Sequence, residues 1–133
     1  MFSLRSRRMA AAGGAAIMLA AAVPAFAAST VNEKLSDYKI TGDSSAKAGT
    51  VTFKVRNAAG GPHELIVIKT RTKAAKLKTK GGAAVTTGSV GRVEVAGGKT
   101  KSLKLKLRKG HYALICNFGD HYGEGMHADF TVK

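Results

Sequence analysis

GHYALIC at residues 110–116 and MHADFTV at residues 126–132 flank the loop NFGDHYGEG at residues 117–125, and these segments decide the fold. Apolar and aromatic residues dominate both flanking segments, which favours two β-strands. The glycine-rich loop joins them as a hairpin. Cys116, His121 and Met126 therefore stand at the end of one strand, in the loop and at the start of the next, where their side chains can converge on one point.

Further strands are predicted upstream, where alternating apolar residues recur in short runs separated by Gly, Asn, Asp or Lys. The runs are 35–40, 51–55, 65–68, 93–95 and 103–107. No segment shows an amphipathic helix. With the C-terminal pair, this spacing predicts six to eight short strands and an all-β antiparallel sandwich.

The first 27 residues read as an export signal. Arg5, Arg7 and Arg8 form a charged head, residues 9–23 an uncharged Ala-rich body, and residues 25–27 a small-x-small cleavage site. The body is shorter than the ~20 residues that cross a bilayer, so we expect cleavage after Ala27 rather than a retained anchor. Both general secretion and twin-arginine export remain open, and the destination is the periplasm or the extracellular space.

The exported domain, residues 28–133, is strongly basic. The chain holds 22 Lys and Arg against 8 Asp and Glu, and removing the three signal arginines leaves 19 cations and a net charge of +11. The basic run from Lys69 to Lys80 predicts a solvated basic excursion from the sheet over residues 70–88. Lys104 and Lys106 alternate with leucines and are expected on the solvent-exposed face of a strand. We expect a monomer that associates with an acidic redox partner or an anionic membrane surface. Nucleic acid is excluded, since no groove-reading motif or stacking aromatics occur.

The residues that could bind a metal offer two imidazoles, one thiolate and one thioether. His63 follows a Gly-Gly-Pro turn, and Cys116 is the only cysteine, so the chain forms no internal disulfide. Taken singly, His63 could be a surface residue, Cys116 could be a small buried apolar residue, and Met126 could pack in the core. Together with His121 they suit both Cu(II) and Cu(I), whereas a zinc site gains little from a thioether. His111, ~17 Å along the strand from Cys116, and His127, on the face opposite Met126, are expected to be structural or exposed.

At these residues the sequence resembles the cupredoxins, the small blue copper proteins. NAAGGPH at residues 57–63 is similar to their first-histidine segment, and residues 110–116, followed by His121, Gly125 and Met126, are similar to their C-terminal ligand loop. The resemblance implies a Greek-key sandwich with one copper ion per chain. His63, Cys116 and His121 would form the trigonal plane of a type 1 site, and Met126 would be the axial ligand.

Two positions depart from many relatives of that family. Gly119-Asp120 stands where they carry Pro-Gly before the loop histidine, and Glu64 stands where they carry Asn after the first histidine. We therefore expect the bracing of the ligand loop to be made differently, with metal binding retained.

The leading functional prediction is an exported blue copper protein that shuttles single electrons. Docking is expected at His121 with Phe118 and Tyr122 beside it, within a rim of acids. These acids are Glu64, Asp120 and Glu124. No nucleophile motif with a spaced base occurs, so we do not expect an enzyme. The alternatives are copper sequestration or delivery without a redox partner, and a metal-free adhesive sandwich.

Overall fold

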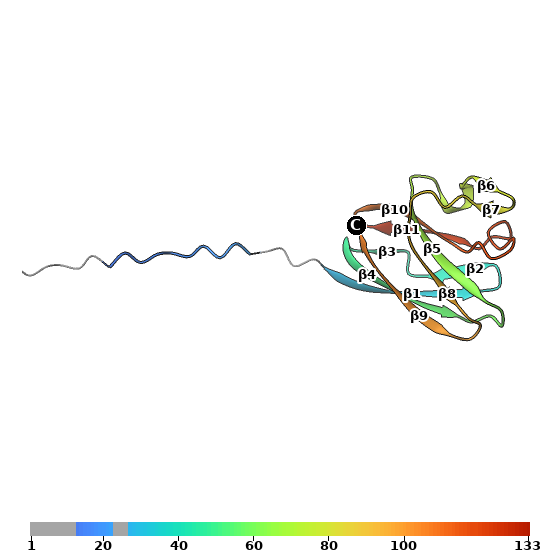
Figure 1. The fold of residues 1–133 in the computed structure, drawn as a ribbon, viewed down its shortest axis with the longest axis horizontal. Coiled ribbons are helices and arrows are strands. Elements are labelled where there is room, and N and C mark those ends of the chain that lie inside the picture. Colours follow the sequence, from blue (N-terminus) through green and yellow to red (C-terminus); the bar gives the residue numbers. More distant parts are fainter. Residues whose placement is uncertain (1–12, 23–26) are drawn as a thin grey trace, which may run out of the picture.

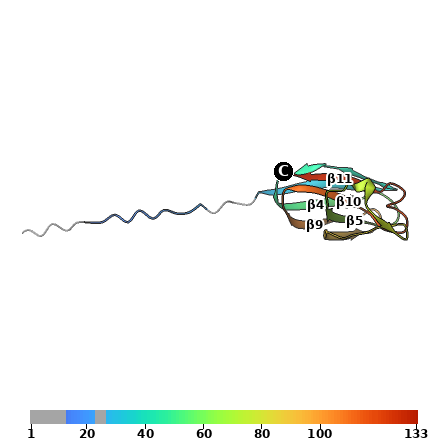
Figure 2. The same ribbon diagram turned by 90° about the horizontal axis from the view of Figure 1, so that it is seen from above.

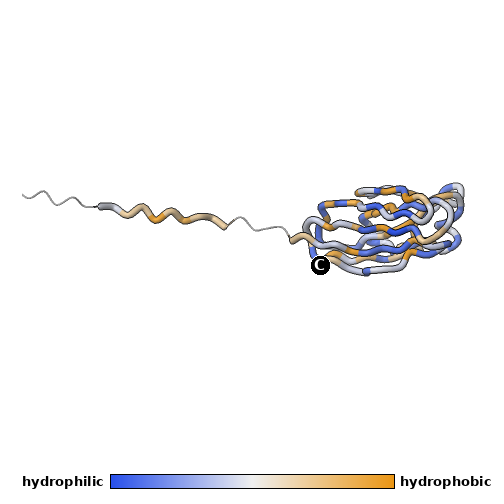
Figure 3. The backbone as a smooth tube through the Cα atoms, turned by 90° about the horizontal axis from the view of Figure 1, so that it is seen from below, coloured by the Kyte–Doolittle hydropathy of each residue, from blue (hydrophilic) through white to orange (hydrophobic). Residues whose placement is uncertain are grey.

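The computed structural model describes residues 13–22 and 27–133. Residues 13–22 form neither helix nor strand and are exposed, and Figure 3 colours most of them as hydrophobic. Within the described residues, no helix is long and apolar enough to span a membrane. The arginines and most of the remaining export signal lie outside the described residues, so cleavage after Ala27 stays a prediction.

Two β-sheets form the body of residues 27–133, and each is assembled from distant parts of the chain (Figure 1). The first sheet has the order β2 (Lys39–Gly42), β1 (Ala28–Ser36), β4 (Gly49–Asn57) and β9 (Thr100–Leu107). The second has the order β3 (Ser45–Ala46), β11 (His127–Val132), β10 (Gly110–Ile115), β5 (His63–Lys69) and β8 (Ser89–Val95). The chain passes from the first sheet to the second between β2 and β3, between β4 and β5, and between β9 and β10, and it returns between β3 and β4 and between β8 and β9.

The main core lies between the sheets because each strand turns alternate residues inward. Phe53 and Val55 of β4 and Leu65 and Val67 of β5 are fully buried there. The rings of Phe53 and Phe130 pack with centroids 5.2 Å apart, which joins the two layers seen from above in Figure 2. Burial of each such side chain contributes about 1.5–3 kcal/mol. The predicted sandwich is confirmed.

Most residues of the segment 70–88 are exposed, as expected of a solvated excursion, but a few small residues pack against the outer face of the second sheet, which the prediction did not include. The segment contains the 3-10 helix η1 (Ala74–Lys76) and the hairpin of β6 (Thr79–Lys80) with β7 (Ala83–Ala84). Ala74 and Ala84 are buried in a second apolar cluster with Ile66 and Ile68 of β5. The small alanines between the lysines fill the space against the sheet, while the lysines project into solvent.

Two details of the predicted strands are wrong. Residues 35–40, expected as one strand, hold the end of β1, a turn at Asp37 and Tyr38, and the start of β2. The chain reverses direction at Tyr38, whose φ is 61°. The sheets are mixed rather than purely antiparallel, because β1 pairs with β4 and β3 with β11 in parallel. Eight of the eleven strands have four or more residues, which agrees with the predicted six to eight.

An acid, Glu33, faces the main core between Val31 and Leu35 of β1 and is 3% exposed. Its Oε1 atom has no hydrogen-bond partner among the described residues. Burial, together with the nearby Asp43, raises the pKa of Glu33 from 4.5 to about 8. Glu33 is therefore protonated at neutral pH in the folded protein.

Glu33→Gln should flatten the dependence of stability on pH. The folded chain keeps the Glu33 proton up to about pH 8, whereas the unfolded carboxyl loses it near 4.5, so the free energy of unfolding falls as pH rises through this window. Glutamine cannot ionise and should make the protein more stable than wild type by about 1–3 kcal/mol at the upper end of the window. Urea unfolding at several pH values measures this change. Glu124→Gln controls for loss of an exposed carboxyl, and equal slopes for wild type and Glu33→Gln would contradict the prediction.

Candidate metal centre

Strand pairing places His63 and Cys116 at one end of the second sheet. β5 begins at His63 and runs antiparallel to β10, with Ile66 paired to Ile115. Cys116 directly follows β10, and its Sγ lies 3.4 Å from the backbone nitrogen of Glu64 as the acceptor of that N–H. The alternation of each strand turns both side chains toward the main core, where both are buried. Figure 1 shows the β10–β11 loop at this end of the sandwich, opposite the C-terminus.

The loop 117–125 brings His121 back over Cys116. The loop is a succession of turns in which His121 N donates to Phe118 O at 2.9 Å and Met126 N donates to His121 O at 3.0 Å. Gly119 adopts a φ of 51° inside this turn, a conformation that glycine adopts without steric cost. Backbone hydrogen bonds therefore fix the position of His121, although Gly119-Asp120 stands where many relatives carry Pro-Gly.

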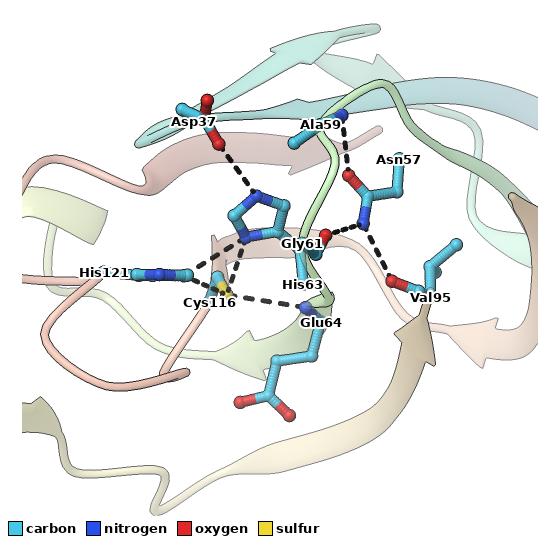
Figure 4. Close-up of polar contacts among 9 residues, drawn as sticks. All are labelled: Asp37, Asn57, Ala59, Gly61, His63, Glu64, Val95, Cys116 and His121. Atoms are coloured by element: carbon cyan, nitrogen blue, oxygen red, sulfur yellow. Dashed lines mark hydrogen bonds and ion pairs between the residues drawn. The ribbon is translucent and has the colours of Figure 1, made fainter. Parts of the chain in front are cut away.

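Three donor atoms converge at this point (Figure 4). The Nδ1 atoms of His63 and His121 are 3.1 Å apart, and Cys116 Sγ lies 3.9 Å from the first and 3.5 Å from the second. A circle through three atoms with these separations has a radius of about 2 Å, the length of a bond from a metal to an imidazole nitrogen or a thiolate. The three residues therefore fit a single metal ion without rearrangement.

Met126, the fourth predicted site residue, lies beside the other three. Its side chain is fully buried in the same core cluster as Cys116, and its carbonyl oxygen accepts a hydrogen bond of 3.1 Å from Cys116 N. The predicted residues His63, Cys116, His121 and Met126 are thus brought together by the fold. A donor set of two imidazoles, one thiol and one thioether has the softness that copper prefers.

Burial sets the protonation of the two buried donors. It lowers the pKa of His63, an effect that the neighbouring His121 reinforces and Asp37 opposes. It raises the pKa of the Cys116 thiol, although backbone N–H groups of Glu64 and Phe118 partly offset the rise. The metal-free site therefore holds a neutral imidazole, which is ready to bind a metal, and a protonated thiol, which must lose its proton first.

Asn57 braces the segment that leads into His63, a role that the sequence pattern did not reveal. Its buried side chain donates to the carbonyl oxygens of Gly61 and Val95, both at 2.8 Å, and accepts from Ala59 N at 3.0 Å. These bonds tie the turn 57–63 to β8 of the opposite sheet (Figure 4). The signal that could have identified this role is an asparagine that continues the alternation of Val51, Phe53 and Val55 into an inward position, three residues before Gly60-Gly61-Pro62.

Glu64 braces the ligand loop in this chain, at the position where many relatives carry asparagine. Its Oε1 accepts from Asn117 N at 3.2 Å, and its Oε2 pairs with Arg92 at 2.8 Å. Asn117 in turn exchanges two hydrogen bonds with the backbone of Ala84. Glu64 is buried, so its predicted place in an exposed acidic rim is wrong, and its carboxylate instead joins the first-histidine strand to the ligand loop.

The surface over the histidines also differs from the prediction. Tyr122 is buried, donates its hydroxyl to Ala74 O at 2.6 Å and accepts from Leu77 N at 3.0 Å, so it cannot form a docking surface. Tyr38, by contrast, lies at the surface beside His121: it is 47% exposed and meets the His121 ring edge-on with centroids 5.5 Å apart. The preceding residue, Asp37, lies 3.6 Å from His63 Nε2. Both come from the β1–β2 turn, which the sequence pattern had merged into a strand.

The two other histidines lie outside the donor cluster, as predicted. His111 bonds Asp129 and the carbonyl oxygen of Thr70, both at 2.7 Å, and so links β10 and β11 to the segment 70–88. His127 packs beside the ring of Tyr122, with centroids 5.5 Å apart.

Comparisons with known proteins agree with this site. The sequence profile for copper-binding proteins of the plastocyanin/azurin family matches residues 30–133. None of the curated protein sequences matches the chain.

Solved structures resemble this fold at low sequence identity. Reduced auracyanin from the photosynthetic bacterium Roseiflexus castenholzii has 15% identity and a TM-score of 0.59, covering 80% of this chain and 96% of its own. Auracyanin A of Chloroflexus aurantiacus, described as a blue copper protein, has 18% identity and a TM-score of 0.56, covering 78% and 99%. Rusticyanin from Thiobacillus ferrooxidans has 16% identity and a TM-score of 0.59, covering 78% and 77%. The donor set and the family profile together fit one type 1 copper ion per chain.

Asn57→Ala should destabilise the protein by about 2–4 kcal/mol, because it leaves two carbonyl oxygens and one N–H unpaired in a buried loop. Chemical unfolding of the metal-free chain measures this loss. Asn32→Ala, which removes an exposed asparagine side chain on β1, is the matched control and should cost under about 0.5 kcal/mol. Equal effects of the two substitutions would show that Asn57 braces nothing.

Proposed function

The chain belongs to the plastocyanin/azurin family of copper-binding proteins, and from this premise we propose that it carries single electrons through one copper ion held by His63, Cys116, His121 and Met126. The observation that supports the proposal most strongly is the spacing of the His63, His121 and Cys116 donor atoms, which already lie on a circle of metal-bond radius. A bound copper ion would supply the Cu(II)/Cu(I) couple, which exchanges one electron at a time.

The protein residues have separate roles in this proposal. His63 and Cys116 are fixed from two paired strands, and His121 is fixed by the turns of the loop. Because these positions are set by backbone hydrogen bonds and core packing, the donors move little when the charge of the site changes. Met126 is fully buried in the core cluster that contains Cys116, and in this proposal its thioether is the weak axial ligand. A site of this rigidity favours electron carriage over catalysis, which needs an open coordination position.

Electrons would enter and leave at His121. Of the three converging donors, His63 and Cys116 are buried, and His121 alone is partly exposed. Tyr38 lies edge-on against the His121 imidazole and is half exposed. Half-buried Phe118 completes the proposed docking surface.

We also propose that the domain is exported to the periplasm or the extracellular space. The support is the sequence of residues 1–27, with its arginine-containing head and Ala-x-Ala end. Mass spectrometry of the protein from its own cells tests this, since a chain that still begins at Met1 would contradict cleavage.

The chain loaded with Cu(II) should be intensely blue, through charge transfer from the Cys116 thiolate to copper. Cys116→Ser should abolish the colour. Met126→Leu should keep the colour and change the reduction potential, because the axial ligand tunes that potential. Absorption spectroscopy measures the colour, and a redox titration of the copper-loaded protein measures the reduction potential. A colourless Cu(II) complex of the unsubstituted chain would overturn the type 1 assignment.

Copper loading should also release about one proton per ion, because the raised pKa keeps the Cys116 thiol protonated in the metal-free chain and binding requires the thiolate. The pH change of a weakly buffered solution during titration with Cu(II) measures this release. Cys116→Ser should lose most of it. Copper uptake without proton release would mean that the thiol does not bind the ion.

Voltammetry separates electron carriage from copper sequestration or delivery. Fast and reversible one-electron exchange supports carriage, because the donors are already in place for both charge states. Slow exchange combined with very tight Cu(I) binding would favour the delivery alternative.

A further inference from the structure

Among residues 13–22 and 27–133, none packs on the outer face of the first sheet, unlike that of the second. Segment 70–88 packs on the second sheet, whereas the first presents its outward positions to solvent. The register of β2, β1, β4 and β9 identifies these positions. They are Ala28, Thr30, Asn32, Lys34, Ser36, Lys39, Thr41, Thr50, Thr52, Lys54, Arg56, Thr100, Ser102, Lys104 and Lys106. We call this set the outer basic face.

The outer basic face is positively charged and contains no acid. Its cations are Lys34, Lys39, Lys54, Arg56, Lys104 and Lys106, and all six are exposed. None of them forms an ion pair with another described residue. Threonine, serine and asparagine fill nearly all the remaining positions.

The cations of this face are also close neighbours. Lys34 and Arg56 are directly paired across β1 and β4, and Lys54 lies two residues before Arg56 on the same face. Like charges at paired positions destabilise a sheet, and surfaces that only solubilise a protein mix both signs. A shallow pocket on this face is lined by Asn32, Glu33, Lys34, Thr41, Gly42, Lys54, Arg56 and Thr100. Its one acid, Glu33, is the inward-facing residue whose raised pKa keeps it protonated at neutral pH, so the charged side chains of the lining are Lys34, Lys54 and Arg56. Such an arrangement is suited to an anion that offsets the repulsion.

From this face we infer that the protein binds the surface of an anionic phospholipid membrane through the outer basic face. Protein interfaces have apolar or aromatic centres, and single-stranded nucleic acid binds aromatic stacking platforms, but the outward positions hold no aromatic residue and only one apolar residue, Ala28. An anionic bilayer requires only a broad array of cations, each worth roughly fivefold in affinity. The lipid phosphate groups would lie over the sheet, with one able to enter the pocket between Lys34 and Arg56.

This inference is independent of the proposed electron transfer. The outer basic face is on the side of the first sheet away from the core, whereas the donor cluster lies at one end of the sandwich. A membrane bound along the face would leave Tyr38 and His121 open to a partner at that end.

Flotation of the full chain with lipid vesicles tests the inference. The chain should bind vesicles of phosphatidylcholine containing phosphatidylglycerol, release from them as salt rises, and bind pure phosphatidylcholine weakly. The variant Lys54→Gln, Arg56→Gln, Lys104→Gln and Lys106→Gln should lose affinity by at least about a hundredfold. The matched control Arg71→Gln, Lys76→Gln, Lys78→Gln and Lys80→Gln removes an equal number of positive charges from segment 70–88. Its affinity for the vesicles should fall by less than about tenfold.

Lysine acetylation of the unsubstituted chain gives a second readout that does not depend on the folding of a variant. Vesicles should protect Lys104 and Lys106 from the reagent and leave Lys76 and Lys78 reactive. Equal loss of affinity in both variants, protection of segment 70–88 alone, or no binding to the anionic vesicles would overturn the inference. Binding to polyglutamate in preference to vesicles would assign the face to an acidic protein and would also overturn it.

Discussion

The antiparallel pairing of β5 with β10 is the constraint on which the candidate site depends. It sets Ile66 opposite Ile115, so the first residue of β5 and the residue after β10 reach the same end of the second sheet. The two-residue alternation then turns His63 and Cys116 toward the core and leaves Glu64 and Asn117 on the other side of the strands. A slip of one residue in either strand would point one donor away from the other.

The remaining parts of the site are held by groups that attach to this pair. Asn57 fixes the approach to His63, Glu64 connects that strand to the ligand loop, and the backbone turns of the loop position His121. Both oxygens of the buried Glu64 side chain have partners, since Oε2 lies 2.8 Å from the guanidinium of Arg92 and Oε1 accepts a backbone N–H. The loop that lacks proline before its histidine is therefore restrained by hydrogen bonds rather than by ring geometry.

Much of this arrangement could be predicted from local patterns. Strand alternation was sufficient to predict the sandwich. The four site residues were predicted from the hairpin that carries Cys116, His121 and Met126, from His63 after its Gly-Gly-Pro turn, and from the resemblance of both segments to the cupredoxins. The failures have two causes, which are contacts between segments distant in sequence and a local turn that continues the apolar pattern. Tyr122 read as a surface aromatic because its partners, Ala74 and Leu77, lie in another segment, and the basic composition of that segment concealed its packing. The turn at Tyr38 was missed because its flanking residues, Leu35 and Ile40, are buried partners across a hairpin and continue the apolar pattern. The burial of Glu33 could not be predicted, because nothing in the neighbouring sequence indicates that an acid occupies an inward position of β1.

We infer that the fold, rather than the ion, sets the positions of the donor atoms. Crystal structures of the metal-free and the Cu(II)-loaded protein test this inference. We expect Nδ1 of His63, Nδ1 of His121 and Sγ of Cys116 to occupy the same positions in both structures, within about 0.5 Å. A metal-free structure in which either imidazole is turned out of the site, or a loaded structure in which other residues bind the copper, would contradict it.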